Sequence, residues 1–238
     1  KALRFMMENR TVTGEEALSE AYTYRAELVS SEPFAAMEEA LFGARATLTF
    51  TSATSARRVS GVVRSIESMG VRDTPSGLMT AFAIELVPHL SLARERVTYR
   101  VFQGATAAEM AKEIFEAWEV PHRFALHEAR APWEYCVQYG ESDYDFVRRV
   151  LAADGIYFTF AQPTEEALVR GLSEIVVLGD THDAHEVPEQ RWFEEGDPGP
   201  VEPGKQGDLA RDPSGAPVLR ARTEGALGEA GAEQVMDF

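Results

Sequence analysis

The chain is poor in cysteine, in basic charge and in long apolar runs. Its 238 residues include one cysteine, Cys136, which excludes an internal disulfide and a cysteine-based zinc site. The apolar neighbours Tyr135 and Val137 predict a buried thiol and not a nucleophile. The 39 Asp and Glu exceed the 23 Lys and Arg, giving a formal net charge of −16, so nucleic acid is not an expected partner. No segment approaches the roughly 18 apolar residues of a membrane span, so we expect no stable membrane insertion.

The chain also lacks a recognisable secretory signal. The opening KALRFMMENR is too charged, and its apolar part too short, for a signal peptide. A chain with so little cysteine fits a reducing, cytosolic origin. The sequence begins at Lys1 and not at Met, which predicts a fragment of a longer protein.

Several enzyme motifs are missing as well. There is no G-x-S-x-G elbow, no phosphate-binding glycine loop and no dinucleotide fingerprint. The strongest enzyme-like feature is THDAHE, in which His182 and His185 stand beside acids. Imidazole and carboxylate suit zinc, iron or manganese, so a metal-dependent hydrolase using His182 and His185 is the alternative from a different class. The spacing matches neither H-E-x-x-H nor H-x-x-E-H, and a solvated turn is the simpler interpretation. We therefore predict no catalytic, metal-binding or cofactor-binding residue.

The first ninety residues are typical of β-strands. Four runs are rich in β-branched and aromatic residues: TYRAELV (23–29), ATLTF (46–50), RRVSGVVRSIES (57–68) and LMTAFAIELVPHL (78–90). Gly70 and DTPSG (73–77) are interpreted as the turn of a hairpin between the last two runs. EPFAAMEEALFG (32–43) predicts a short helix that ends at Gly43. Short strands separated by turns favour an antiparallel sandwich or barrel.

The pattern changes to amphipathic helices after Gln103. TAAEMAKEIFEAW (106–118) carries apolar residues at helical spacing on one face. Thr106 and Glu109 form the capping box that marks a helix start. This pattern predicts a helix that packs one face on a core.

A second helix is predicted from Ser142. Ser142 is a good N-cap, and Asp143 falls in the first turn, where the helix dipole favours negative charge. Arg148 and Arg149 are expected nearer the C-terminal end, where cations are favoured, and Gly155 is placed to close the helix in a left-handed cap. IYFTF (156–160) and EIVVLGD (174–180) then read as strands, whereas the proline-rich, acidic stretch 188–217 reads as loop.

The stretch EYCVQYGESDYDFVRRVLAADGIYFTF (134–160), called the signature segment below, resembles the "QY-x-ESDxxFxxRLxEExGIxYxF" signature of VgrG proteins. These are spike-tip proteins of type VI secretion, and the resemblance lies in their part related to the contractile-phage baseplate hub, or late control protein D. GEEALSEAYTYRAEL (14–28), RRVSGVV (57–63) and ELVPHLSLARERVTYRVFQGATAAEM (85–110) resemble further family stretches in the same order. The departures include Gly140, where Arg is common. The structural signature consists of Gln138, Tyr139, Glu141, Ser142, Asp143, Phe146, Arg149, Gly155, Tyr157 and Phe158.

The resemblance implies an α+β fold that is mainly β. Barrel-like antiparallel β domains of the phage baseplate hub type would carry an α/β insertion. Residues 1–97 would form the first barrel-like hub domain, and 98–160 the insertion with two helices and the signature strand. Residues 161–238 would begin the second barrel-like domain with its acidic Pro/Gly-rich loop.

The resemblance also implies a structural role without catalysis or cofactors. A homotrimer would cap the Hcp-like tube protein, contact baseplate proteins, and carry a PAAR-type tip protein and effectors through C-terminal regions missing here. The protein would be cytoplasmic before firing and then be secreted through the contractile apparatus. The alternative within this class is the hub of an extracellular contractile injection system or of a phage tail.

Overall fold

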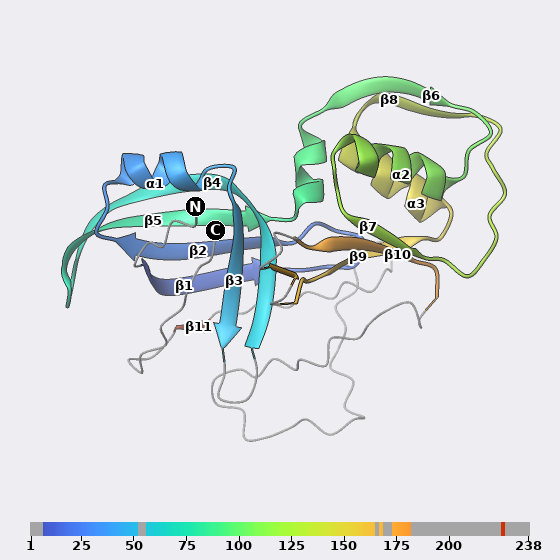
Figure 1. The fold of residues 1–238 in the computed structure, drawn as a ribbon. Coiled ribbons are helices and arrows are strands. Elements are labelled where there is room, and N and C mark those ends of the chain that lie inside the picture. The colour runs from blue at the N-terminus through green and yellow to red at the C-terminus, as the bar shows by residue number, and fades with distance from the viewer. Residues whose placement is uncertain (1–6, 52–55, 165–166, 169–172, 182–224, 227–238) are drawn as a thin grey trace, which may run out of the picture. The chain divides into compact units, whose positions relative to one another are not determined.

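The computed structural model describes residues 7–51, 56–164, 167–168, 173–181 and 225–226 (Figure 1). Chain contacts divide the protein into two compact units. Unit 1 includes Tyr22–Val87, and unit 2 consists of Leu18–Ala21 and Pro88–Val187. The hub domains expected from the resemblance (1–97, 98–160 and 161–238) follow family boundaries and stay a prediction.

Unit 1 is built on one antiparallel sheet, in the order β11-β1-β2-β5-β4-β3, which curls into a half-barrel (Figure 1). Its elements are β1 (Met7–Glu15), β2 (Thr23–Ser30), α1 (Phe34–Leu41), β3 (Arg45–Thr51), β4 (Ala56–Thr74), β5 (Gly77–Val87) and β11 (Gly225–Ala226). The short helix and all four predicted strands are present, but the last run (78–90) is a strand only as far as Val87, and His89 begins a 3-10 helix. The central strand β5 buries four consecutive residues, Ala81, Phe82, Ala83 and Ile84, because α1 packs against β4 and β5.

The predicted hairpin of unit 1 is present, but Gly70 does not lie in its turn. β4 continues past Gly70 and pairs with β5 as far as Thr74 opposite Gly77. Gly70 lies at a register shift and has a φ of +83°, so it forms a bulge within the strand. The interpretation of Gly70 as turn material was wrong, since a glycine in a strand-rich stretch marks a bulge as readily as a turn.

Unit 2 places two helices beside two small sheets. Its elements are the 3-10 helix η1 (His89–Arg94), β6 (Val97–Phe102), α2 (Ala107–Ala117), β7 (His122–Ala125), β8 (Cys136–Ser142), α3 (Asp143–Ala153), β9 (Tyr157–Ala161) and β10 (Ile175–Gly179). β10 pairs in parallel with β7 and antiparallel with β9, while β6 and β8 form an antiparallel pair of their own. In the part of the chain that the structure describes, no helix combines the length and apolar character that crossing a bilayer requires.

Both predicted helices of unit 2 begin and end at their local signals. At the start of α2, Thr106 and Glu109 form the complete capping box. At the start of α3, the Ser142 hydroxyl accepts a hydrogen bond from the backbone N–H of Asp145. Gly155, just past the end of α3, has a φ of +68° and is in the left-handed conformation expected for it.

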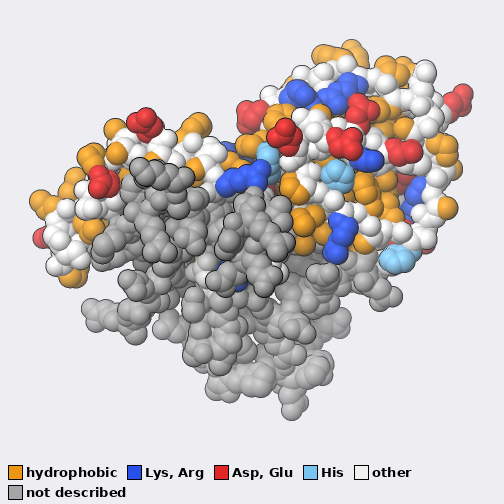
Figure 2. Space-filling view, in the orientation of Figure 1, with side chains coloured by type: hydrophobic (Ala, Val, Ile, Leu, Met, Phe, Trp, Pro, Cys, Tyr) orange, Lys and Arg blue, Asp and Glu red, His pale blue; other side chains and the backbone are white. Residues whose placement is uncertain are grey.

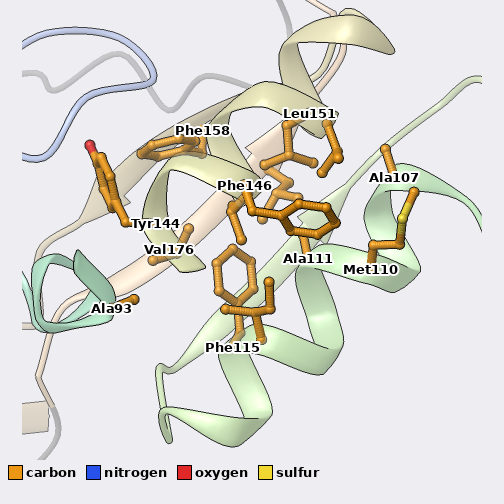
Figure 3. Packing of buried hydrophobic residues seen from close by; sticks show 14 of the residues in the cluster. Ala93, Ala107, Met110, Ala111, Phe115, Tyr144, Phe146, Leu151, Phe158 and Val176 are labelled. Atoms are coloured by element: carbon orange, nitrogen blue, oxygen red, sulfur yellow. The ribbon is translucent and has the colours of Figure 1, made fainter. Parts of the chain in front are cut away.

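The core of unit 2 lies between α2, α3 and the three-stranded sheet (Figure 3). Met110 and Phe115 of α2 face Phe146 of α3, and all three side chains are fully buried. Phe146 also stacks on Phe102 of β6, with ring centroids 5.1 Å apart. Cys136 is 5% exposed, which confirms the predicted buried thiol. The aromatic residues of the signature segment therefore do not act as one contact surface, because Phe146 and Phe158 belong to the core.

Candidate functional site

The signature segment supplies β8, α3 and β9 of unit 2. Its ten signature residues do not converge on one cavity. They fall into three groups: Gln138, Tyr139 and Glu141 on β8; Ser142, Asp143, Phe146 and Arg149 at the cap and along α3; and Gly155, Tyr157 and Phe158 after the helix and on β9.

The first group of contacts centres on the carboxylate of Asp143, whose side chain is 0% exposed. Arg96 donates to it through Nε at 2.6 Å, and Arg100 through Nη2 at 3.1 and 3.2 Å. Trp118 donates through Nε1 at 2.8 Å and Gln138 through Nε2 at 2.9 Å. One buried carboxylate thus connects β6 and the residue before it, the C-cap residue of α2, and β8 to the start of α3.

The same contacts decide the charge of Asp143. Burial alone would raise the pKa of Asp143, because it disfavours the anion. Hydrogen bonds from Gln138, Trp118 and Arg96, together with the positive charge of Arg100, outweigh burial and hold the pKa of Asp143 below its usual value. The carboxylate is therefore ionised at neutral pH. The predicted position of Asp143 in the first helical turn is correct. Its four hydrogen-bond donors were not predicted, because stabilisation by the helix dipole alone is compatible with a carboxylate at the surface.

Arg149 of α3 binds two residues of β8, Glu141 and Val137. Its guanidinium forms a two-point ion pair with Glu141, from Nη2 at 2.6 Å and from Nε at 3.1 Å. Nη2 also donates to the carbonyl oxygen of Val137 at 3.0 Å. The hydrogen bond with Glu141 raises the pKa of Arg149. The expectation that this arginine stabilises the C-terminal end of the helix was wrong, because the last turn of α3 holds no basic residue.

Arg148 has a different partner, in the short segment Leu18–Ala21. It forms an ion pair with Glu20, and its Nε donates to the carbonyl oxygen of Ser19 at 3.2 Å. Arg94 and Arg148 both lie over the ring of Tyr144, with guanidinium carbons 3.7 and 5.6 Å from its centroid. The expected role of Arg148 as a C-terminal helix cation is thus replaced by a long-range ion pair.

The segment Leu18–Ala21 is held by further hydrogen bonds to the signature segment. The N–H of Ala21 donates to the hydroxyl of Tyr144 at 2.7 Å. Ser19 bonds Phe158 twice, donating from its backbone N–H at 2.9 Å and accepting at Oγ from the N–H of Phe158 at 3.2 Å. Two stretches that separately resemble family motifs, 14–28 and 134–160, therefore meet through these four residues.

Two signature residues follow α3: Gly155 ends the helix, and Tyr157 of β9 contacts the chain just past β10. The hydroxyl of Tyr157 donates to the carbonyl oxygen of Thr181 at 2.6 Å. Nearby, backbone N–H groups of Glu128 and His127 donate to Asp180, as does Arg130, and they lower the pKa of Asp180 to about 2.

Tyr139 lies on the outer face of the β6–β8 pair. Its ring meets that of Tyr99 edge-on, with centroids 5.2 Å apart. Next to this pair, between Thr98 and Tyr99, the register of the strands changes, because the extra residue Gly140 of β8 has a φ of +63° and forms a glycine bulge. Glycine in place of the family's usual arginine fits this left-handed conformation.

The charged groups of the signature residues are paired within unit 2. The carboxylates of Asp143 and Glu141 are taken up by arginines and other donors of the same unit. The described ranges hold no group of three or more His, Cys, Asp or Glu side chains placed to bind a metal ion. His182 and His185 lie outside those ranges, so the metal hypothesis remains untested by the structure.

Comparison with known proteins gives a consistent set of similarities. The profile of the phage tail baseplate hub (GPD) family matches residues 15–204. The type VI secretion system spike protein VgrG4b of Pseudomonas aeruginosa is 33% identical over 182 residues, which is 75% of this chain and 21% of that protein. VgrG1b of the same organism is 28% identical over 185 residues, which is 77% of this chain and 23% of that protein.

A solved structure shows the same fold. The E. coli c3393 protein, described as a component of the type VI secretion system similar to the T4 tail proteins gp27 and gp5, matches with a TM-score of 0.65 at 21% identity. The match covers 77% of this chain and 50% of that chain, and it confirms the predicted mainly β hub fold. The chain spans less than a quarter of the length of both P. aeruginosa relatives. Since the family profile covers most of the chain, the protein belongs to the phage tail baseplate hub (GPD) family.

Proposed function

We propose that the protein is a non-enzymatic structural hub at the base of a type VI secretion spike. The observation that carries the proposal is the hub-family match over residues 15–204, together with relatives named as type VI secretion spike proteins. The pairing of the charged signature residues Asp143, Glu141 and Arg149 within unit 2 supports a structural role, because these groups bind one another and neighbouring side chains of the fold.

The hub acts as a homotrimer. Three chains of charge −16 carry a formal charge of −48 (3 × −16), so association must overcome electrostatic repulsion. At physiological salt this repulsion is screened beyond about 8 Å, and buried apolar contact between barrel-like domains then favours assembly.

The trimer caps an Hcp-like tube protein and contacts baseplate proteins, while a PAAR-type tip protein and effectors bind through more C-terminal regions. The protein is cytoplasmic before firing and leaves the cell through the contractile apparatus.

Sedimentation velocity tests the assembly. The complete gene product and residues 1–238 alone are compared across a salt series from about 0.01 M to 1 M, over which the Debye length falls from about 30 to 3 Å. We expect a trimer for the complete product at every salt concentration. Residues 1–238 alone should be monomeric or weakly trimeric, with more monomer at low salt. A complete product that stays monomeric at micromolar concentration would remove the basis for a spike hub.

Two alternatives give different observations. A hub of an extracellular contractile system or of a phage tail shares this family, and the genes beside the one encoding this chain separate it from a type VI system. A metal-dependent hydrolase would purify with stoichiometric zinc, iron or manganese, and a His182→Ala or His185→Ala variant would lose that metal. Elemental analysis of both variants beside the unmodified protein decides between hydrolase and hub.

A further inference from the structure

The β6–β8 pair presents an apolar face to solvent. The exposed residues of this face, called the aromatic face below, are Val97 (61%), Tyr99 (68%) and Val101 (55%) of β6, Tyr139 (79%) of β8, and Tyr135 (57%) directly before β8. β6 and β8 arch over α2 and α3 at one end of the unit (Figure 1), and hydrophobic side chains gather at that end in the space-filling view (Figure 2). Contiguous apolar surface with aromatic side chains is typical of protein contact sites.

The two edges of this strand pair differ. On β8, the carbonyl oxygen of Val137 is covered by Arg149, so it points away from β6. Opposite residues of an antiparallel pair either exchange both hydrogen bonds or exchange none. Val101, opposite Val137, and Tyr99, two residues earlier, therefore direct their N–H and C=O groups away from β8. Among the described residues, β6 has no strand on that side. The edge of β6 is open, whereas that of β8 is covered.

The aromatic face carries no charge of its own. The inward-facing residue of β6, Arg100, binds the buried Asp143. On the β8 side, Glu141 is paired with Arg149. In a chain with a net charge of −16, this face is a local uncharged surface. It therefore matches a partner that is itself uncharged at the point of contact.

We propose that the open edge of β6 binds an extended segment of a partner protein by strand addition. The segment is uncharged and carries apolar side chains at alternate positions, which pack on Tyr99 and Tyr139 while its backbone pairs with Tyr99 and Val101. A helix or a lipid surface offers no backbone groups that could pair with the edge, whereas an extended segment does. This inference goes beyond the proposed hub function and does not depend on trimer formation.

The first test uses a neutral fluorescein-labelled peptide, Thr-Val-Thr-Tyr-Thr-Val-Thr with both ends blocked, titrated with residues 1–238 and followed by anisotropy. Two N-methylated versions carry the methyl groups either on all Thr or on all Val and Tyr positions. Strand addition uses the N–H groups of alternate residues only. We expect one methylated version to bind about tenfold more weakly or worse, and the other to bind within about twofold of the parent. Hydrogen exchange at Tyr99 and Val101 should slow when the parent peptide is bound.

The second test uses variants of the aromatic face. Tyr99→Thr combined with Tyr139→Thr should weaken peptide binding by about tenfold, since each aromatic ring contributes packing. Phe42→Thr and Leu78→Thr are matched controls, because these unit 1 side chains are also exposed (64% and 76%) and should leave binding unchanged. Near-ultraviolet circular dichroism verifies that all variants are folded.

Four results would overturn the proposal. They are no saturable binding of the peptide, equal weakening by both N-methylation patterns, unchanged binding by the double tyrosine variant, and a preference for another occupant. The last would show as concentration-dependent dimers that the tyrosine changes abolish, or as binding to phosphatidylcholine vesicles in place of the peptide.

Discussion

Replacing Asp143 with asparagine removes one negative charge from unit 2 while keeping the shape of the side chain. The carboxylate accepts from four side chains, two of them arginines, and is 0% exposed. In the variant, the amide N–H₂ group is a donor, so it cannot accept the hydrogen bonds that the replaced carboxylate oxygen accepted. Arg96 and Arg100 then lose their common partner.

The magnitude follows from the surroundings of the two arginines. Removing one partner of a buried ion pair costs about 3 to 5 kcal/mol, because the remaining charge is left uncompensated. The side chain of Arg96 is 41% exposed and can turn to water, whereas that of Arg100 is 22% exposed. We therefore expect the lower end, about 3 kcal/mol, for Asp143→Asn at pH 7.

The effect depends on pH with a defined sign. The pKa of Asp143 is depressed in the folded protein, so its contribution to stability is present above the unfolded value of about 3.9 and is lost as pH falls through the folded value. Urea unfolding of both proteins should show a constant difference above about pH 5 and a shrinking one below about pH 4. The indole N–H resonance of Trp118, which donates to Asp143, should shift in the variant at pH 7 and locate the change.

The control is Glu67→Gln. Glu67 pairs with Arg25 at the surface, where the two side chains are 63% and 45% exposed, so its loss should cost about 0.5 kcal/mol or less. If Asp143→Asn is as mild as this control, or if its effect is the same at pH 3 and pH 7, the carboxylate does not hold the unit together and the reasoning fails.

Three further changes test the helix cap, the core and the bulge, each by the urea midpoint at constant slope. Phe146→Ala should cost about 3 to 5 kcal/mol because the ring is fully buried, and a near-neutral result would mean that it is solvent-exposed. Ser142→Ala should cost about 1 kcal/mol through loss of the N-cap, and no change would show that the cap is dispensable. Gly140→Ala should cost more than Gly104→Ala: both have positive φ, but only at Gly140 would the new methyl group lie 3.1 Å from the hydroxyl of Tyr99. Equal costs would contradict the predicted clash.

Elements with local signals were predictable from the sequence. The capping box at Thr106, the N-cap at Ser142 and the left-handed Gly155 each depend on residues within one or two helical turns. The strands β2 to β5 also follow from their β-branched and aromatic content. The mainly β hub fold was predicted from the resemblance to the family motifs.

The contacts of Asp143 were not predictable in the same way. Arg96 lies 47 residues before it, and nothing near Asp143 in the sequence distinguishes a buried carboxylate from an exposed first-turn acid. Arg148 and Arg149 were misassigned for the same reason, since their partners Glu20 and Glu141 lie outside the helix. Strand β6 did carry a local signal, because Val97, Tyr99 and Val101 alternate with the polar Thr98 and Arg100.

The membership of Leu18–Ala21 in unit 2 has a consequence for synthesis on the ribosome. Ser19 bonds Phe158, which is translated 139 residues later. At about 5 to 20 residues per second, the nascent segment waits roughly 7 to 28 s for its partner to be made. A gene fragment that starts at Pro88 would encode Tyr144 and Arg148 without Ala21 and Glu20. Producing this unit by itself would therefore require the four-residue segment to be grafted back, for example by circular permutation.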